Sequence, residues 1–219
     1  MRQDEGRSVK EIARLIGVSA SSVSRWVRDI ELTEEQHAAL QERNRLHWRQ
    51  RLARAAMSAK ALERRRAWQR EGRRKTREEN HVFTAGCMLY WAEGSRSRNK
   101  LVFTNSDPEM IRFFVGFLRS AFALPAERIR VTCNLFADHA ERQHEIEEFW
   151  LEITGLPRPC LYRSTVNRYS RYSQKKRKNK LPYGTCRIAV HSTEIAQTIY
   201  GSIQEVAGFD RPEWLDMPA

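Results

Sequence analysis

The sequence predicts an α+β protein of three consecutive parts: a small helical segment at 1–32, a long basic helix at 33–79, and a mixed α/β domain at 80–219. Three observations lead to this prediction. Apolar residues recur at helical spacing in the first part, the second has no Pro and is rich in Ala, Arg, Glu, Gln and Leu, and the third holds most of the aromatic and β-branched residues. With 219 residues, 41% of them hydrophobic, the chain can pack one large or two small domains.

The positive charge of the chain is concentrated in two segments. The formal net charge is +12. Residues 41–79 hold fourteen Lys and Arg against five Glu, and residues 163–180 hold eight Lys and Arg and no acid. These segments contribute +17, so the other 162 residues carry −5. Such an excess points to a polyanionic partner, of which nucleic acid is the commonest.

Several protein classes are excluded by composition. No window approaches the roughly 18–20 apolar residues of a membrane span, and residues 1–10 lack the apolar core of a signal peptide. The four cysteines form no C-x-x-C pair, which argues against a zinc finger or a disulfide framework. Cys87 and Cys133 lie in apolar runs and are predicted to be reduced core thiols. We therefore expect a cytoplasmic, bacterial or phage-like, nucleoid-associated protein with no membrane partner and no small-molecule substrate.

Residues 5–28 have the pattern of two short helices joined by a tight turn. Ser8 is the expected N-cap of the first helix, with Glu11 three residues later, which is the capping-box spacing. Gly17 supplies a turn residue with positive φ, and Ser19 is the expected cap of the second helix. The residues expected to be buried are Val9, Ile12, Ala13, Ile16, Val18, Val23, Trp26 and Val27.

This spacing resembles the helix-turn-helix of resolvase/invertase and other homeodomain-like bacterial proteins. In that motif the second helix enters the major groove of DNA with its N-terminal residues at the base edges. Arg25 would then bind a guanine edge bidentately or hold a phosphate. The resemblance implies DNA contacts from Ser19, Ala20, Ser21, Ser22, Ser24, Arg25 and Arg28. An ordinary helical hairpin is the alternative.

The segment 33–79 consists of strong helix formers and has no Gly before Gly72, so it predicts one long helix or two helices end to end. Unbroken from Glu34 to Glu71, it would extend about 57 Å at 1.5 Å per residue. Arginines fall on nearly every face of this helix. We interpret it as a linker that follows the phosphate backbone, with Arg64, Arg65 and Arg66 among its contacts. The alternative is a solvated helix whose charge keeps it soluble.

The segment 80–219 predicts the order α-β-α-β-α-β-α. An apolar helix ends at Glu93 and Gly94, and the last helix covers 194–206. Between them, strands are expected at 101–105, 129–136 and 185–191. One intervening helix is capped by Ser106 or Asp107 and turns Met110, Ile111, Phe113, Phe114, Phe117 and Leu118 inward; the other turns Ile146, Phe149, Trp150 and Ile153 inward.

The sequence Leu-Tyr-Trp-Ala-Glu-Gly-Ser at 89–95, with this order of elements, resembles the LAGLIDADG homing endonuclease fold and its WhiA-type regulator relatives, over about residues 81–206. The resemblance implies an α-β-β-α-β-β-α domain whose curved antiparallel sheet lies on DNA. Glu93 and Gly94 take the positions of the acid and glycine that end the family motif. The chain departs from the motif at Met88, where the family has a small glycine, and at Trp91, where it has an aspartate.

In the family, the acid that Glu93 matches binds the catalytic divalent metal, so the resemblance implies Mg²⁺ at Glu93 if the chain is a nuclease. The chain has one visible motif copy, and a nuclease would therefore have to act as a homodimer. Alternatively, Glu93 only ends a helix before Gly94, facing solvent or pairing with Arg96 or Arg98.

The segment 163–180 forms a basic arm in which cations alternate with Tyr, Asn, Gln and Ser. This mixture suits phosphate and sugar contacts. The predicted DNA-binding residues of the arm are Arg163, Arg168, Tyr169, Arg171, Tyr172, Lys175, Lys176, Arg177, Lys178 and Lys180. A lysine-rich surface loop is the alternative.

Together these features predict a sequence-specific double-stranded DNA-binding protein, a transcriptional regulator without a cofactor that is built on a degenerate homing-endonuclease fold. The alternative is a Mg²⁺-dependent homing-type endonuclease acting as a homodimer through Glu93. A third class is an RNA-binding or architectural protein that relies on its basic surface.

Overall fold

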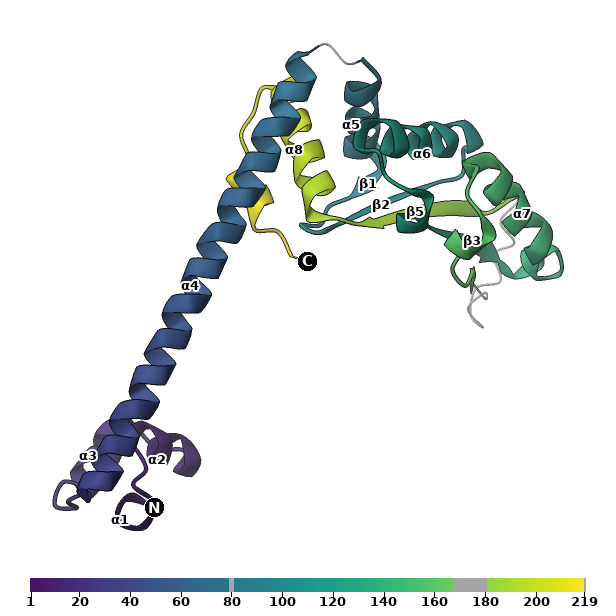
Figure 1. The fold of residues 1–219 in the computed structure, drawn as a ribbon. Helices are drawn as coiled ribbons and strands as arrows, with labels where there is room; N and C mark the ends of the chain where they lie inside the picture. The colour runs from purple at the N-terminus through teal and green to yellow at the C-terminus, as the bar shows by residue number, and fades with distance from the viewer. Residues whose placement is uncertain (79–80, 168–180, 219) are drawn as a thin grey trace. The chain divides into compact units, whose positions relative to one another are not determined.

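The computed structural model describes residues 1–78, 81–167 and 181–218. The protein is α+β, as predicted, and divides into two compact units, Met1–Ala61 and Leu62–Ala219. Helix α4 (Glu34–Arg77) contributes to both units, and its 44 residues confirm the prediction of a long helix (Figure 1). With no Pro and no Gly before Gly72, it extends about 66 Å at 1.5 Å per residue.

The first unit contains three short helices before α4: α1 (Arg2–Glu5), α2 (Val9–Ile16) and α3 (Ala20–Trp26). The expected cap of α2 is present, because Ser8 Oγ accepts from the Glu11 N–H at 3.2 Å and the Ser8 N–H donates to the Glu11 carboxylate at 2.7 Å. Gly17 ends α2 in the left-handed conformation with φ 70°. Ser19 caps α3 by accepting from the Ser22 N–H at 3.1 Å.

The core of the first unit is small. It consists of Ile12, Ala13 and Val23, with Val9 and Val27 packed against them. Three residues expected to be buried are instead exposed: Ile16 by 44%, Val18 by 37% and Trp26 by 63%. Helices of eight and seven residues make only about two turns each, so each has few inward positions, and Ile16 and Trp26 fall outside them. Val18 lies in the turn between the two helices.

The second unit consists of a five-stranded sheet with helices packed on one face (Figure 1). Its strands are β1 (Gly94–Ser95), β2 (Lys100–Asn105), β3 (Arg130–Phe136), β4 (Thr165–Asn167) and β5 (Thr185–His191). Its helices after α4 are α5 (His81–Glu93), α6 (Pro108–Phe122), α7 (Gln143–Thr154) and α8 (Thr193–Ala207), with 3₁₀ turns η1 (Ala126–Arg128), η2 (Ala137–Arg142), η3 (Arg158–Cys160) and η4 (Pro212–Leu215). The strands and helices expected from 101–105, 129–136, 185–191 and 194–206 are therefore present.

The sheet has the strand order β1-β2-β5-β3-β4. Neighbours pair antiparallel except for β3 and β4, which are parallel. The expected antiparallel sheet is thus correct for four strands and wrong at the β4 edge. The connection from β3 to β4 contains α7, and such a helical crossover allows a parallel pair.

The core of the second unit lies between the sheet and its helices, which cover one face (Figure 1). Alternate residues of β3 and β5 point into it, as the strand period requires. Aromatic rings fill its centre: Phe114 of α6 stacks on Phe103 of β2 with 4.3 Å between ring centroids and lies 6.0 Å from Tyr90 of α5.

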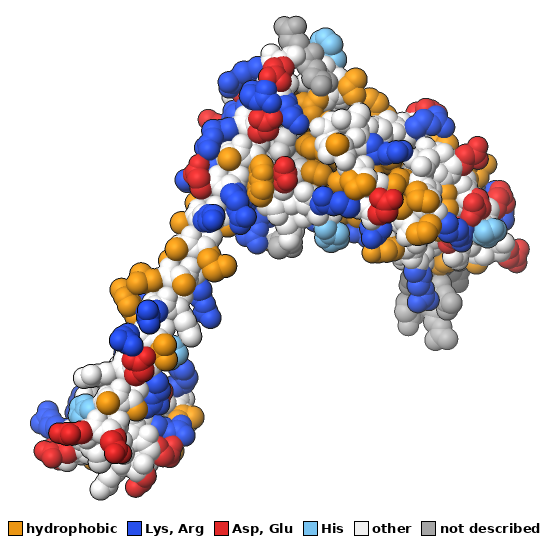
Figure 2. Space-filling view, viewed as in Figure 1, with side chains coloured by type: hydrophobic (Ala, Val, Ile, Leu, Met, Phe, Trp, Pro, Cys, Tyr) orange, Lys and Arg blue, Asp and Glu red, His pale blue; other side chains and the backbone are white. Residues whose placement is uncertain are grey.

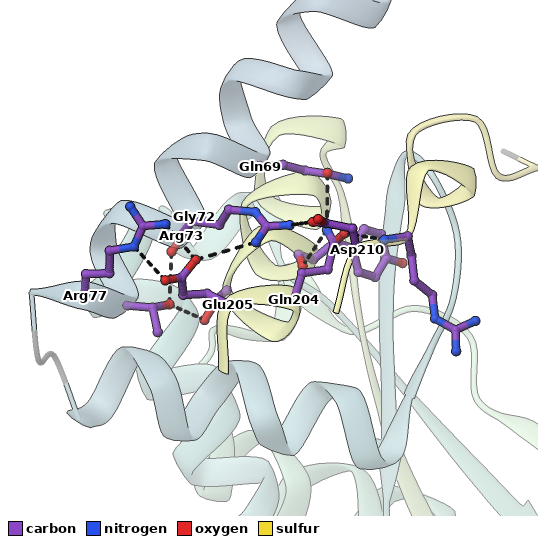
Figure 3. A network of polar contacts seen from close by, with 11 residues as sticks. Gln69, Gly72, Arg73, Arg77, Gln204, Glu205 and Asp210 are labelled. Atoms are coloured by element: carbon purple, nitrogen blue, oxygen red, sulfur yellow. Dashed lines mark hydrogen bonds and ion pairs between the residues drawn. The ribbon is translucent and has the colours of Figure 1, made fainter. Parts of the chain in front are cut away.

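Helix α4 joins the second unit through a close crossing with α8 (Figure 3). A Cβ at Gly72 would lie 1.9 Å from the carbonyl oxygen of Thr198, and one at Gly201 would lie 2.0 Å from that of Gln69. Glycine is therefore required on both helices. The buried Gln69 amide donates to Gln197 Oε1 at 2.7 Å. At the rim, Arg77 donates to Glu205 at 2.6 Å and lowers the pKa of that carboxyl.

All four cysteines are buried and unbonded. Burial raises the pKa of Cys87 to about 12 and that of Cys133 to about 11. It also raises the pKa of Cys160 and, strongly, that of Cys186, which lies opposite Cys133 on the neighbouring strand. The prediction that Cys87 and Cys133 are core thiols is confirmed.

Among the described residues, no helix combines the length and the apolar character that crossing a membrane requires.

Candidate nucleic-acid interface

The exposed side of α3 carries most of the helix-turn-helix side chains predicted to contact DNA. Ala20, Ser21, Ser24 and Arg25 are exposed on the helix, and Arg28 is exposed just beyond its end. The hydroxyls of Ser19 and Ser22 already take part in hydrogen bonds within the protein, because Ser19 Oγ caps the helix and lies 2.9 Å from the Ser22 hydroxyl. The structure therefore places small, hydrogen-bonding side chains and one arginine together on two turns of helix.

The three consecutive arginines of α4 have different surroundings. Arg64 is exposed, and Arg66 is exposed beside Glu63 at 3.7 Å. Arg65 is only 12% exposed and pairs with Asp216 at 2.6 Å. The ion pair of Arg65 with Asp216 joins the C-terminal segment to α4. In Figure 2, Lys and Arg side chains along the first part of α4 alternate with hydrophobic ones.

The face of the sheet that the helices leave uncovered is polar and basic. Apart from Val102, which is itself buried, residues on this face alternate with the buried positions. They are paired across strands, such as Lys100 with His191 and Thr132 with Arg187. None of the strand residues on it is acidic. By this alternation and pairing, the face consists of Ser95, Lys100, Val102, Thr104, Arg130, Thr132, Asn134, Phe136, Thr165, Asn167, Thr185, Arg187, Ala189 and His191.

Two contacts on this open sheet face hold its side chains in place. Arg130 Nε donates to the Tyr162 hydroxyl at 2.9 Å, and its guanidinium lies 5.1 Å from the centre of the tyrosine ring. Asn134 Nδ2 donates to Thr185 Oγ1 at 3.2 Å. Arg187 and Lys100 have no ion-pair partner within the described ranges. Such a surface can donate hydrogen bonds to phosphate oxygens without repelling them.

The beginning of the basic arm is fixed by a buried carboxylate. Glu147 of α7 accepts from the Ser164 hydroxyl at 2.7 Å, from Gln143 Nε2 at 2.8 Å and from Arg158 at 2.9 Å. Burial acts to raise the pKa of Glu147, but these three donors outweigh it and hold the pKa below its usual range. Ser164 directly precedes β4, so this contact also positions the exposed Arg163.

The remaining arm residues lie outside the described residues. They are Arg168, Tyr169, Arg171, Tyr172, Lys175, Lys176, Arg177, Lys178 and Lys180.

Glu93 is the last residue of α5 and is exposed. No ion pair joins it to Arg96, Arg98 or any other residue that the structure describes. In the same part of the chain, no group of three or more His, Cys, Asp or Glu is placed to hold a metal ion. Mg²⁺ is commonly held by one or two carboxylates together with water and substrate phosphates, and Glu93 supplies one exposed carboxylate.

The residues of the open sheet face were not predicted as contacts. Lys100, Arg130 and Arg187 are single cations in strands, separated by apolar residues, and do not form a charge cluster in the sequence. Only the cross-strand register brings them to one surface. The sequence did contain one signal for this face: in 129–136 and 185–191, polar residues alternate with apolar ones, so the polar residues of each strand share one side of the sheet.

Searches with protein-family models, against curated proteins and against solved structures each found no match to this chain.

Proposed function

We propose that this protein is a sequence-specific double-stranded DNA-binding protein that acts as a transcriptional regulator. The observation that carries the proposal is the open sheet face, on which Lys100, Arg130, Arg187 and His191 lie among hydroxyl and amide side chains without an acidic strand residue. A neutral or mixed surface would be expected of a sheet face that only contacts water, because the chain outside its two basic segments has a net charge of −5.

The N-terminal unit supports the same function. Its capped α2, left-handed Gly17 and capped α3 agree with the helix-turn-helix resemblance at the ends of the two helices. In the proposed mechanism, Arg25 and the serines of α3 contact base edges, and the open sheet face and basic arm contact phosphates. Base contacts then set the sequence preference, whereas phosphate contacts supply most of the affinity.

The order of elements in the second unit supports the proposed LAGLIDADG-like ancestry. Helix α5 is followed by β1 and β2, then by α6, β3, α7, β4, β5 and α8. This agrees with the α-β-β-α-β-β-α order of the family when both α7 and β4 are treated as additions between β3 and β5. The uncovered face of the sheet is the one that the resemblance assigns to DNA.

The test is a fluorescence-anisotropy titration of the full chain with duplex DNA over a series of salt concentrations. We expect Arg130→Gln with Arg187→Gln to weaken binding and to reduce the slope of log affinity against log salt by about 1.8, two phosphate contacts at about 0.9 each. The control pair, Arg112→Gln with Arg119→Gln, removes the same charge from the exposed side of α6 and should leave the slope unchanged. Equal effects of the two pairs would contradict the proposal.

Sequence preference is tested with duplexes enriched from a random library. Arg25→Ala should cost about 1–3 kcal/mol on the enriched duplex and less on random duplex. If wild-type protein binds random RNA and random DNA equally, and Arg25→Ala changes neither affinity, the protein belongs to the RNA-binding or architectural class instead.

The endonuclease alternative is favoured by one observation: Glu93 ends α5 directly before the edge strand β1 and carries no intramolecular partner among the described residues. It is tested by incubating supercoiled and enriched duplex DNA with the protein and Mg²⁺, beside Glu93→Gln. Binding without nicking would reject the alternative. Metal-dependent cleavage that is lost in Glu93→Gln would establish it and would overturn the regulator proposal.

A further inference from the structure

The first unit contains a basic groove that is separate from the exposed side of α3. It lies between α2 and α4 and has a volume of about 420 Å³. Its basic lining consists of Lys10, Arg14, Arg43, Arg51 and Arg54, together with His47. No residue of α3 lines this groove, and none of the six was predicted from the sequence as a DNA contact.

The spacing of these residues places the basic side chains of each helix on one face of that helix. Lys10 and Arg14 are four residues apart on α2, and Arg43, His47, Arg51 and Arg54 follow one another by four, four and three residues on α4. The α4 row extends over about 16 Å at 1.5 Å per residue. That length corresponds to about five successive phosphates of one strand, at 3.4 Å per phosphate along the duplex axis.

The one acid that lines the groove is already occupied. Glu11 accepts the Ser8 N–H, which together with the Ser8 side chain lowers the pKa of the carboxyl, and it lies 3.7 Å from Arg43. Arg43 also donates to the Gly6 carbonyl at 3.5 Å. Lys10, Arg14, Arg51 and Arg54 are exposed and have no ion pair with any residue that the structure describes. The groove therefore has four cations available to a ligand.

We propose that this groove binds the phosphate backbone of duplex DNA, as a contact additional to those of α3 and the sheet. The proposal rests on the proposed function and assigns it a further binding site. A row of evenly spaced cations with a second cationic wall matches a ridge of phosphates. A flat anionic membrane would match it less well, because the lining has only Leu40 as an apolar side chain to enter the lipid.

The decisive experiment uses the full chain and a random-sequence DNA duplex of 30 base pairs in anisotropy titrations across a salt series. Arg51→Gln with Arg54→Gln should weaken binding on the order of tenfold at 0.15 M salt and reduce the salt slope by about 1.8. Lys10→Gln with Arg14→Gln, on the other wall, should give a similar loss. All four side chains are exposed, so the helix content measured by circular dichroism should stay at the wild-type value.

The matched control is Arg45→Gln with Arg49→Gln. Both residues are exposed and lie on α4 between the groove residues, and helical geometry places them on the opposite side of the helix. Their substitution removes the same amount of charge as the groove pair does. The control should keep the wild-type slope. If wild-type protein binds the duplex but the groove and control pairs behave alike, the groove proposal is wrong and the proposed function stands. If wild-type protein binds no duplex, the proposed function itself fails.

A parallel titration with phosphatidylserine-containing vesicles distinguishes binding to DNA phosphates from binding to the phosphates of a lipid membrane. Loss of vesicle binding in Arg51→Gln with Arg54→Gln, without any loss of duplex binding, would assign the groove to a membrane and overturn the proposal. Loss of duplex binding alone supports it.

Discussion

The two compact units reach an ordered structure by different means. The first has a three-residue core and defines its helix ends by side-chain caps at Ser8 and Ser19. The second buries a continuous core between five strands and the helices on one face. Local hydrogen bonds therefore contribute a large share of the order in the first unit, whereas apolar burial dominates in the second.

The largest expected effect comes from removing a ring from the core of the second unit. Phe114→Ala should lower the free energy of unfolding of that unit by about 3–5 kcal/mol, because Phe114 is fully buried against Phe103 and Tyr90. Phe113→Ala, one residue away on α6 but 38% exposed, is the control and should have a much smaller effect. Urea unfolding followed by peptide-level hydrogen exchange measures both, and protection of residues 1–61 should not change.

The next effect tests whether the end of α4 belongs to the second unit. Gly72→Ala should destabilise that unit by about 1–3 kcal/mol, because the added methyl group would meet the backbone of α8. Gly116→Ala, at an open position of α6, should instead stabilise it by about 0.5–1 kcal/mol through helix propensity. Thermal denaturation monitored at 222 nm distinguishes the two signs. A stabilising Gly72→Ala would show that α4 can move away from α8 at no cost.

In the first unit, removing a helix cap should lower the stability of the helix more than a substitution at another exposed position does. Ser8→Ala removes the hydroxyl that accepts from the Glu11 N–H and should cost about 1 kcal/mol. Ser24→Ala, an exposed change inside α3, serves as the control and should be neutral or slightly stabilising. Exchange rates of amides in residues 9–27 report the difference. Equal amide exchange rates in the two variants would show that the Ser8 cap does not contribute to the order of the first unit.

The smallest effect is confined to acidic pH. Because the folded-state pKa of Glu147 is lowered, its contribution is present above the usual glutamate pKa of about 4.3 and is lost as pH falls through the folded value. Glu147→Gln should therefore flatten the acid side of the stability profile of the second unit. The profile is measured as urea midpoints from pH 7 to pH 3. An unchanged acid slope would exclude Glu147 as a source of acid sensitivity.

The sequence predicted the elements whose pattern is set within a single segment. Helix α4, the strands at 101–105 and 185–191, and the caps at Ser8 and Ser19 follow from local composition and spacing. Strands β1 and β4 were not predicted because they have two and three residues and exist only through pairing with β2 and β3.

The candidate interface was predictable only where charge is contiguous in sequence. The serines of α3 and Arg25 were proposed from the sequence, but the groove residues and the open sheet face were not, because helix packing and strand register assemble them from distant residues. Conversely, Arg65 belongs to a basic run yet its guanidinium is held by Asp216, a partner 151 residues away. Trp26 shows the same limit for burial, since a large apolar side chain finds no space beside so small a core.

The four buried thiols have a practical consequence for spectroscopy. With every native cysteine inside the second unit and the pKa of each raised by burial, the folded protein offers little thiolate to an alkylating reagent. A single cysteine introduced at exposed Ser21 should then accept a maleimide dye or spin label selectively, without first removing the native cysteines. Distances from α3 to labelled DNA would become measurable in the otherwise unaltered chain.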